Sequence, residues 1–299
     1  MTAAQKRRSN QAPRSGAAAT VNPARRAGGR PGRAFPPVRE LSEQRRAGAA
    51  VFTLSRPERR NSMSEAMLGA LHGAILAAGQ DGGVRAIVIA AEGSVFSAGH
   101  DLSELSHHRT DADGGRAFFA RVMRRCAAMM TAIVACPKPV IAAVEGAALA
   151  AGCQLVATCD LAVASENARF CTPGVNIGLF CSTPMVALSR AVGRKAAMEM
   201  LLTGELIDAS RACALGLVNR VVPERDLDAA VAALAGQIVA KSPLTLAIGK
   251  EAFYRQAEMG LDEAYAYASE VMTRNMLARD AAEGIDAFLG KRQPVWTGT

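Results

Sequence analysis

Aromatic side chains are scarce in this 299-residue chain: they make up 4% of it, although half of all residues are apolar. The core must therefore be filled by Ala, Val, Leu, Ile and Met. Small side chains of this kind suit helices packed closely on the strands of an α/β protein. No apolar run approaches the roughly 18 residues of a membrane-spanning helix, so we expect no membrane span.

Patterns that would indicate a metal site or a disulfide framework are also missing. The seven cysteines are odd in number and form no CxxC pair, and there are only four histidines. Cysteines without such spacing are typical of reduced thiols that pack as small apolar side chains. We expect no metal and no disulfide framework.

Three common motifs of nucleotide-binding proteins and hydrolases are absent. No G-x-G-x-x-G follows the first predicted strand, which excludes a dinucleotide-binding dehydrogenase. The segment from Gly93 to His100 lacks the Lys-Ser/Thr ending of a P-loop. No G-x-S-x-G nucleophile elbow supports a serine hydrolase.

The positive charge is confined to one end of the chain. The net charge is +8, but residues 1–39 carry nine basic side chains and no acidic one, which leaves the rest at −1. A near-neutral body excludes a nucleic-acid partner. We interpret residues 1–45 as a disordered tail. Its arginines also resemble a mitochondrial transit peptide, although its prolines disfavour an amphipathic helix.

Arginine supplies 29 of the 35 basic residues, a bias typical of GC-rich coding. This composition favours the bacterial cytoplasm, with the mitochondrial matrix as the alternative.

Hydrophobic periodicity predicts an α/β body over residues 46–240 and a helical section over 241–299, with ordered structure from about Gly48. Short apolar runs predict strands at 49–54, 84–91, 140–144, 161–164 and 218–222. One-sided apolar patterns predict helices from Ser64 onward and at 117–135, 185–192, 194–203, 208–215, 224–240, 243–257 and 261–289. The expected topology is a ββα-like alternation with parallel crossovers.

Two loops of small residues follow predicted strands and open toward helices. The first is Phe96–Leu102 (FSAGHDL) and the second is Glu145–Gln154 (EGAALAAGCQ). Small side chains let a ligand approach the main chain, and helix N-termini present unpaired N–H groups. Two such groups can hold a developing oxyanion.

With these two loops, the chain resembles the enoyl-CoA hydratase/isomerase (crotonase) superfamily over residues 48–296. The matching segments are SRPERRNSMS, VFSAGHDL, PVIAAVEGAALAAGCQL, CDLAVASENARF and LLTGELIDASRACALGLVNRVVP. PGVNIGLFCSTP and AFLGKRQPVW resemble the subgroup of enoyl-CoA hydratase domain-containing protein 3. The resemblance implies a spiral of ββα units with a helical C-terminal trimerisation section, assembled as a homotrimer or a dimer of trimers.

The resemblance also implies an acyl-CoA thioester as ligand, with coenzyme A as part of the substrate and no separate cofactor. It places the two enolate-binding N–H groups on His100 and Ala151. It further assigns substrate or coenzyme A contacts to a set of residues in both halves of the chain: Arg60, Ser97, Ala98, Gly99, Asp101, Leu102, Ser182, Phe288 and Lys291.

The chain departs from the family pattern at both hydratase glutamates. Gln154 stands at the first glutamate position and Gly174 at the second. Gln has the shape of Glu without a titratable proton, and Gly has no side chain, so the usual acid and base of hydration are missing. Asp101 either fixes the His100 ring or caps the following helix.

Two functions from different classes stay open. One is an enzyme of fatty-acid and acyl-CoA metabolism, of lyase or isomerase type, that uses the enolate-binding pair with weak or absent hydration. The other is a non-catalytic acyl-CoA binder or regulatory subunit.

Overall fold

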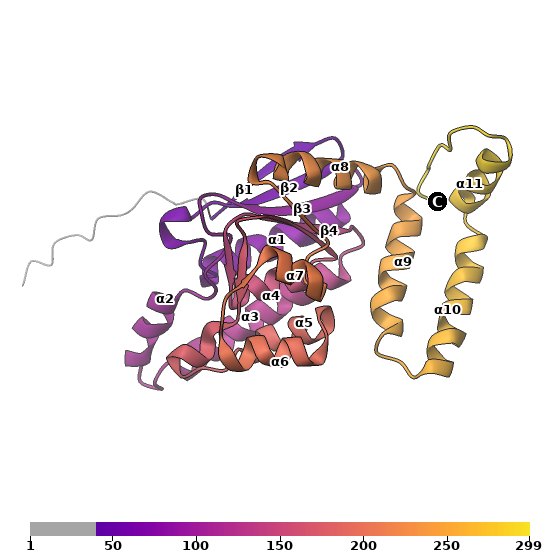
Figure 1. Ribbon diagram of the computed structural model, residues 1–299. Coiled ribbons are helices and arrows are strands. Elements are labelled where there is room, and N and C mark those ends of the chain that lie inside the picture. The colour runs from indigo at the N-terminus through magenta and orange to yellow at the C-terminus, as the bar shows by residue number, and fades with distance from the viewer. Residues whose placement is uncertain (1–39) are drawn as a thin grey trace, which may run out of the picture. The chain divides into compact units, whose positions relative to one another are not determined.

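The computed structural model of the protein describes residues 40–299, and its ribbon is shown in Figure 1. The strands form two sheets. Within these residues the larger sheet has the order β1-β2-β3-β4-β6-β9. Its strands are β1 (Leu41–Arg46), β2 (Ala49–Leu54), β3 (Ala86–Ala91), β4 (Val140–Val144), β6 (Leu161–Ser165) and β9 (Arg220–Val222).

The strands from β2 to β9 pair in parallel, as the near-continuous apolar runs predicted. Side chains along β4 alternate between two buried clusters. Val140, Ala142 and Val144 join the larger cluster, whereas Ile141 and Ala143 join the smaller one. The sheet is therefore covered on both faces, the environment in which uninterrupted apolar strands are stable.

The first strand corrects the prediction that ordered structure begins near Gly48. β1 pairs antiparallel with β2, and the tight turn between them places Ala47 and Gly48 at φ +46° and +82°. The segment LSEQRR is mostly exposed and charged, so it has no apolar run to reveal it. Charged side chains on an edge strand also discourage pairing with another chain. The rest of the predicted tail, residues 1–39, lies outside the described residues.

A smaller sheet joins three short segments that lie far apart in the sequence. It consists of β5 (Ala147–Leu149), β7 (Arg169–Cys171) and β8 (Ile207–Asp208), in the order β5-β7-β8. β5 lies inside the loop predicted at 145–154. Two hydrogen bonds pair it with the other predicted loop: Ser97 N–H donates to Ala147 O at 3.1 Å, and Leu149 N–H donates to Ser97 O at 2.8 Å.

Helices flank the sheet. They are α1 (Glu65–Gln80), α2 (Leu102–His107), α3 (Arg116–Ala135), α4 (Ala151–Thr158), α5 (Ser182–Ala191), α6 (Arg194–Thr203), α7 (Ala209–Leu215) and α8 (Leu227–Val239). The apolar patterns predicted all of these except α2 and α4, which are the helices that follow the two loops of small residues. α8 covers the smaller core cluster through Leu227, Val231 and Leu234. α1, α3 and α4 contribute to the larger cluster.

The C-terminal section consists of α9 (Pro243–Gln256), α10 (Leu261–Met276) and α11 (Arg279–Leu289). The single helix predicted over 261–289 is two helices, because the chain breaks at Leu277 and Ala278. α9 and α10 pack side by side (Figure 1). α9 is tied to the body by Lys250, whose Nζ donates to Asp160 Oδ2 at 2.6 Å and to Ile133 O at 2.8 Å.

Across residues 40–299 no single helix is long and apolar enough to cross a membrane. Residues 224–239 and 243–256 together have the length and composition of a membrane span, but the two segments are bent by 102° relative to each other.

Candidate functional site

The site is built where the two predicted loops meet. Gly99 has φ +90°, and its Cα lies against the start of α4. A Cβ added to Gly99 would lie 2.8 Å from Ala150 Cβ and 3.3 Å from Ala151 N. The main chain at 99–100 and the first residue of α4 are therefore immediate neighbours, although they are some fifty residues apart in the sequence.

The two predicted N–H donors differ from their neighbours in the hydrogen-bond pattern. Within residues 40–299, neither the His100 N–H nor the Ala151 N–H donates a hydrogen bond to a protein acceptor. The N–H groups on either side are occupied: Gly99 N–H faces Ser97 Oγ at 3.3 Å, and Ala150 N–H donates to Cys171 O at 2.9 Å. A pair of unpaired main-chain donors beside a helix N-terminus can bind an anionic oxygen.

Ala150 holds this geometry in an unusual conformation. It precedes α4 with φ +48° and ψ −114°, a region that glycine adopts far more readily than alanine. A strained residue persists only where its surroundings impose it. Here the paired Ser97 and β5 segments on one side, and α4 on the other, fix the backbone that orients the Ala151 N–H.

Gln154 lies one turn into α4 and is buried, with 4% of its surface exposed. Its Oε1 accepts a weak hydrogen bond from the Cys126 thiol at 3.9 Å. Gln154 also lines a cavity of about 480 Å³ whose wall is mostly apolar and includes Met130, Val134, Val186 and Phe253. The residue at the first glutamate position thus lines an apolar hollow.

Gly174 lies in the turn of helix at Pro173–Ile177, and the space beside it is occupied. A Cβ at 174 would lie 2.6 Å from Leu179 O and 2.9 Å from Cys181 Sγ. Leu179 N–H also donates to Gly174 O at 2.9 Å, which closes this turn. A side chain at 174 could therefore be accommodated only if the turn at 179–181 shifted. Nothing in the sequence indicated that Cys181 would lie against this glycine.

Three cysteines gather around this part of the site. Cys153 on α4, Cys171 on β7 and Cys181 before α5 lie close enough to influence one another's ionisation. Burial raises the pKa of Cys153 to about 12 and that of Cys171 to about 11. Burial also raises the pKa of Cys181, although the Gly174 N–H opposes the shift. These thiols are protonated at neutral pH.

The alternative roles of Asp101 are resolved by its contacts. Its Oδ1 accepts the N–H groups of Ser103 and Glu104, so it caps α2. Its Oδ2 accepts from the Ser62 hydroxyl at 3.1 Å. Burial favours a raised pKa for Asp101, but these hydrogen bonds and the nearby Arg59 outweigh it and hold the pKa below its usual value. Within residues 40–299, no hydrogen bond joins this carboxylate to the His100 ring.

The remaining predicted site residues are spread over the fold. Ser97 is fully buried between the loops, and the chain continues through the half-buried Ala98 to the exposed Leu102. Arg60 is exposed, and its carbonyl accepts the Ala98 N–H at 3.0 Å. Ser182 is exposed at the start of α5, with its hydroxyl 3.3 Å from Phe180 O. Phe288 on α11 is 82% exposed, and Lys291 follows that helix at φ +51°.

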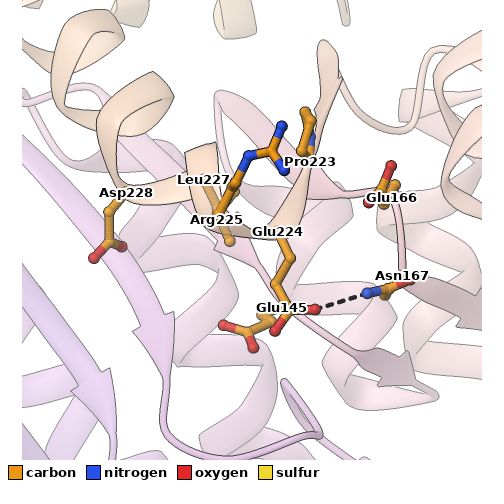
Figure 2. A pocket seen from close by; sticks show the side chains of 8 residues that line it. All are labelled: Glu145, Glu166, Asn167, Pro223, Glu224, Arg225, Leu227 and Asp228. Atoms are coloured by element: carbon orange, nitrogen blue, oxygen red, sulfur yellow. Dashed lines mark hydrogen bonds between the residues drawn. The ribbon is translucent and has the colours of Figure 1, made fainter.

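A second hollow, of about 560 Å³, is lined by Glu145 at the start of the 145–154 loop and by residues near Glu224, and it is acidic (Figure 2). Glu145, which precedes Gly146, faces Glu224, and Asn167 Nδ2 donates to Glu224 Oε2 at 2.7 Å. Burial and the neighbouring Glu224 carboxylate raise the pKa of Glu145.

Comparison with known proteins assigns the family. A family model described as Enoyl-CoA hydratase/isomerase matches residues 44–299, and the chain belongs to this family. Its likeness within the family is to proteins named enoyl-CoA hydratase domain-containing protein 3, mitochondrial. The Xenopus laevis protein is 48% identical over 85% of each chain, and the human protein is 48% identical over 87% of this chain and 84% of that one.

Solved structures give the same result. The crystal structure of an enoyl-CoA hydratase from Mycobacterium smegmatis is 50% identical, with a TM-score of 0.82 over 86% of this chain and 99% of that one. That of human enoyl-CoA hydratase domain-containing protein 3 is 47% identical, also with a TM-score of 0.82, over 86% and 100%. The predicted α/β crotonase fold and the predicted family and subgroup are confirmed.

Proposed function

We propose that this chain binds an acyl-CoA thioester and holds its carbonyl oxygen between the N–H groups of His100 and Ala151. The observation that carries this proposal is the pairing of two free main-chain donors at the junction of the loops. When a thioester becomes an enolate, negative charge concentrates on that oxygen. Each preorganised donor of this kind is worth about 3–4 kcal/mol to the charged state. Family membership supports the choice of an acyl-CoA ligand.

The same site is expected to hydrate enoyl-CoA poorly or not at all. Hydration needs one group that takes a proton from water and one that delivers a proton to carbon. Gln154 cannot do either, and Gly174 offers no side chain. The nearest thiols are protonated because they are buried. In contrast, a relative of 36% identity from Escherichia coli is named 2,3-dehydroadipyl-CoA hydratase.

A non-catalytic acyl-CoA binder or regulatory subunit is the second candidate, favoured by the absence of both glutamates. The enzyme and the non-catalytic binder are distinguished by measuring binding and turnover side by side on a panel of saturated and unsaturated acyl-CoA thioesters. We expect micromolar binding and crotonyl-CoA hydration far below that of a two-glutamate relative. Rapid, saturable hydration by the wild-type protein would contradict the weak-hydratase assignment.

Coenzyme A recognition is proposed for the first loop. The adenine would lie against the main chain near Ser97, Ala98, Asp101 and Leu102. Arg60 is exposed and able to meet a phosphate, which guanidinium groups bind well. Phe288 and Lys291 would complete the site of a neighbouring subunit. Exposed apolar side chains on α10 and α11, among them Leu261, Met272, Met276 and Phe288, support a homotrimer or a dimer of trimers.

Localisation in the bacterial cytoplasm stays a prediction. The Xenopus and human relatives carry the word mitochondrial in their names, which supports the matrix alternative.

A further inference from the structure

The His100 ring contains a buried nitrogen without a partner. Its Nε2 makes no hydrogen bond to any residue in the described part of the chain, yet it is shielded from solvent. A buried polar atom left unpaired typically costs about 1–3 kcal/mol, so each such atom in a folded protein calls for an explanation. A ligand atom that reaches Nε2 on binding would supply the missing partner.

The protonation of the ring follows from its other nitrogen. Nδ1 lies 3.4 Å from Met63 O, and a carbonyl oxygen can only accept, so Nδ1 carries the hydrogen. Nε2 is then a bare lone pair. Burial lowers the pKa of the imidazole, and the Met63 carbonyl opposes this only in part, so the ring is uncharged at neutral pH. Nε2 is thus an acceptor with nothing to accept.

The covalent structure of the residue places this acceptor near the proposed ligand. The main-chain N–H that binds the thioester oxygen and the ring that carries Nε2 belong to the same residue. They are therefore never more than a side chain's length apart. The first carbons of an acyl group lie one to three bonds from that oxygen, which is a similar distance.

We propose that Nε2 of His100 is the proton acceptor of this site and that it removes a proton from C2 of the bound acyl-CoA. The proposal rests on the acyl-CoA binding proposed above. In this step the C2–H bond breaks and its electron pair forms the C1–C2 double bond of the enolate. The carbonyl π pair moves to the oxygen held by the His100 and Ala151 N–H groups. The proton goes to Nε2, where it can be replaced by one from the solvent, and return of a proton from Nε2 to C2 restores the thioester, so no co-reactant is consumed.

Other side chains around the site are poorer acceptors. Gln154 has no lone pair of comparable basicity, and the Cys153 thiol stays protonated because its pKa is raised to about 12. The Asp101 carboxylate is occupied by Ser62 and by the cap of α2. This leaves His100 as the basic side chain that the proposed site offers.

The test is hydrogen–deuterium exchange at C2 of butyryl-CoA, a saturated thioester that cannot be hydrated. The full-length protein is incubated with it in D2O, exchange is followed by NMR, and affinity is measured by calorimetry in parallel. His100→Gln keeps the main-chain N–H and a polar side chain but cannot take a proton. We expect it to bind within about threefold of wild type and to lose exchange by about a hundredfold, the size of a general-base contribution.

The matched control is His72→Gln on α1, which should catalyse exchange at C2 of butyryl-CoA at the wild-type rate. His100→Ala leaves a cavity, and added imidazole should restore part of its exchange, an effect that a structural role would not show. Wild-type binding without exchange, or exchange unchanged in His100→Gln, would overturn the proposal and leave acyl-CoA binding intact. Absence of wild-type binding would overturn both.

Discussion

The Cα of Gly99 lies against the main-chain nitrogen of Ala151, so that a Cβ at 99 would sit 3.3 Å from that nitrogen. This contact joins the ends of two loops that bracket the free N–H pair. It also explains why the position holds glycine, since φ is +90° and the Ala150 methyl group already occupies the space.

Gly99→Ala is expected to weaken acyl-CoA binding by at least about tenfold, because the new methyl group pushes the two donors apart. Gly114→Ala is the matched control: Gly114 also has positive φ, at +66°, but nothing lies within 4 Å of a Cβ placed there. Both variants should lose stability from backbone strain, and only the first should lose affinity in calorimetry. Equal affinities in the two variants would contradict the assignment of the ligand to this junction.

Gly174→Ala is expected to destabilise the protein by about 1–3 kcal/mol, the usual cost of overpacking a well-packed site. The added Cβ would lie 2.6 Å from Leu179 O, and a main-chain oxygen cannot rotate away as a side chain can. Urea unfolding measures the loss. Gly236→Ala in α8, where a Cβ meets nothing within 4 Å, should be neutral or stabilising. A Gly174→Ala protein as stable as wild type would show that the turn relaxes freely.

Ala150→Gly is expected to stabilise the protein by about 1 kcal/mol, because it relieves the strain of a non-glycine residue at φ +48° and ψ −114°. The stability gained from this relief exceeds the stability lost because glycine raises the conformational entropy of the unfolded chain. Ala147→Gly in β5, where no positive φ is required, should instead be destabilising by about 0.5–1 kcal/mol. Chemical denaturation of both variants gives the comparison, and a less stable Ala150→Gly protein would show that the methyl group contributes packing instead.

Glu145→Gln is expected to raise the thermal midpoint at pH 7 and to have little effect near pH 4. The pKa of Glu145 is higher in the folded protein than its usual value, owing to burial and to Glu224. The folded state therefore holds this proton more tightly, so stability falls as the pH rises from the ordinary glutamate pKa through the raised one. Gln removes that loss. A midpoint difference that does not depend on pH would mean that the two carboxylates are not coupled.

The sequence was informative where local pattern decides the structure. The strands at 49–54 and 140–144 were predicted with their observed bounds, because uninterrupted apolar runs occur where a parallel sheet is buried on both faces. The first helix starts directly after Ser64, close to its predicted start, and the Ser64 side chain caps α1 by accepting the Met67 N–H. The two site loops were found because each combines small residues with a strand-to-helix transition.

The remaining features depend on contacts between distant segments. β1 is a charged edge strand, so its pairing with β2 leaves no periodic apolar signal. β5, β7 and β8 have three residues or fewer, and neighbouring chain segments impose their extended form. The fit of Cys181 against Gly174, and the burial of the His100 ring beside Met63, exist only once the chain has folded.

The crowding at Gly174 also bears on how this site could be redesigned. A carboxylate can be introduced by one substitution only where there is space for its side chain. Here Leu179 O and Cys181 Sγ occupy the space beside Gly174, so an acid at this position would require compensating changes at 179–181 as well.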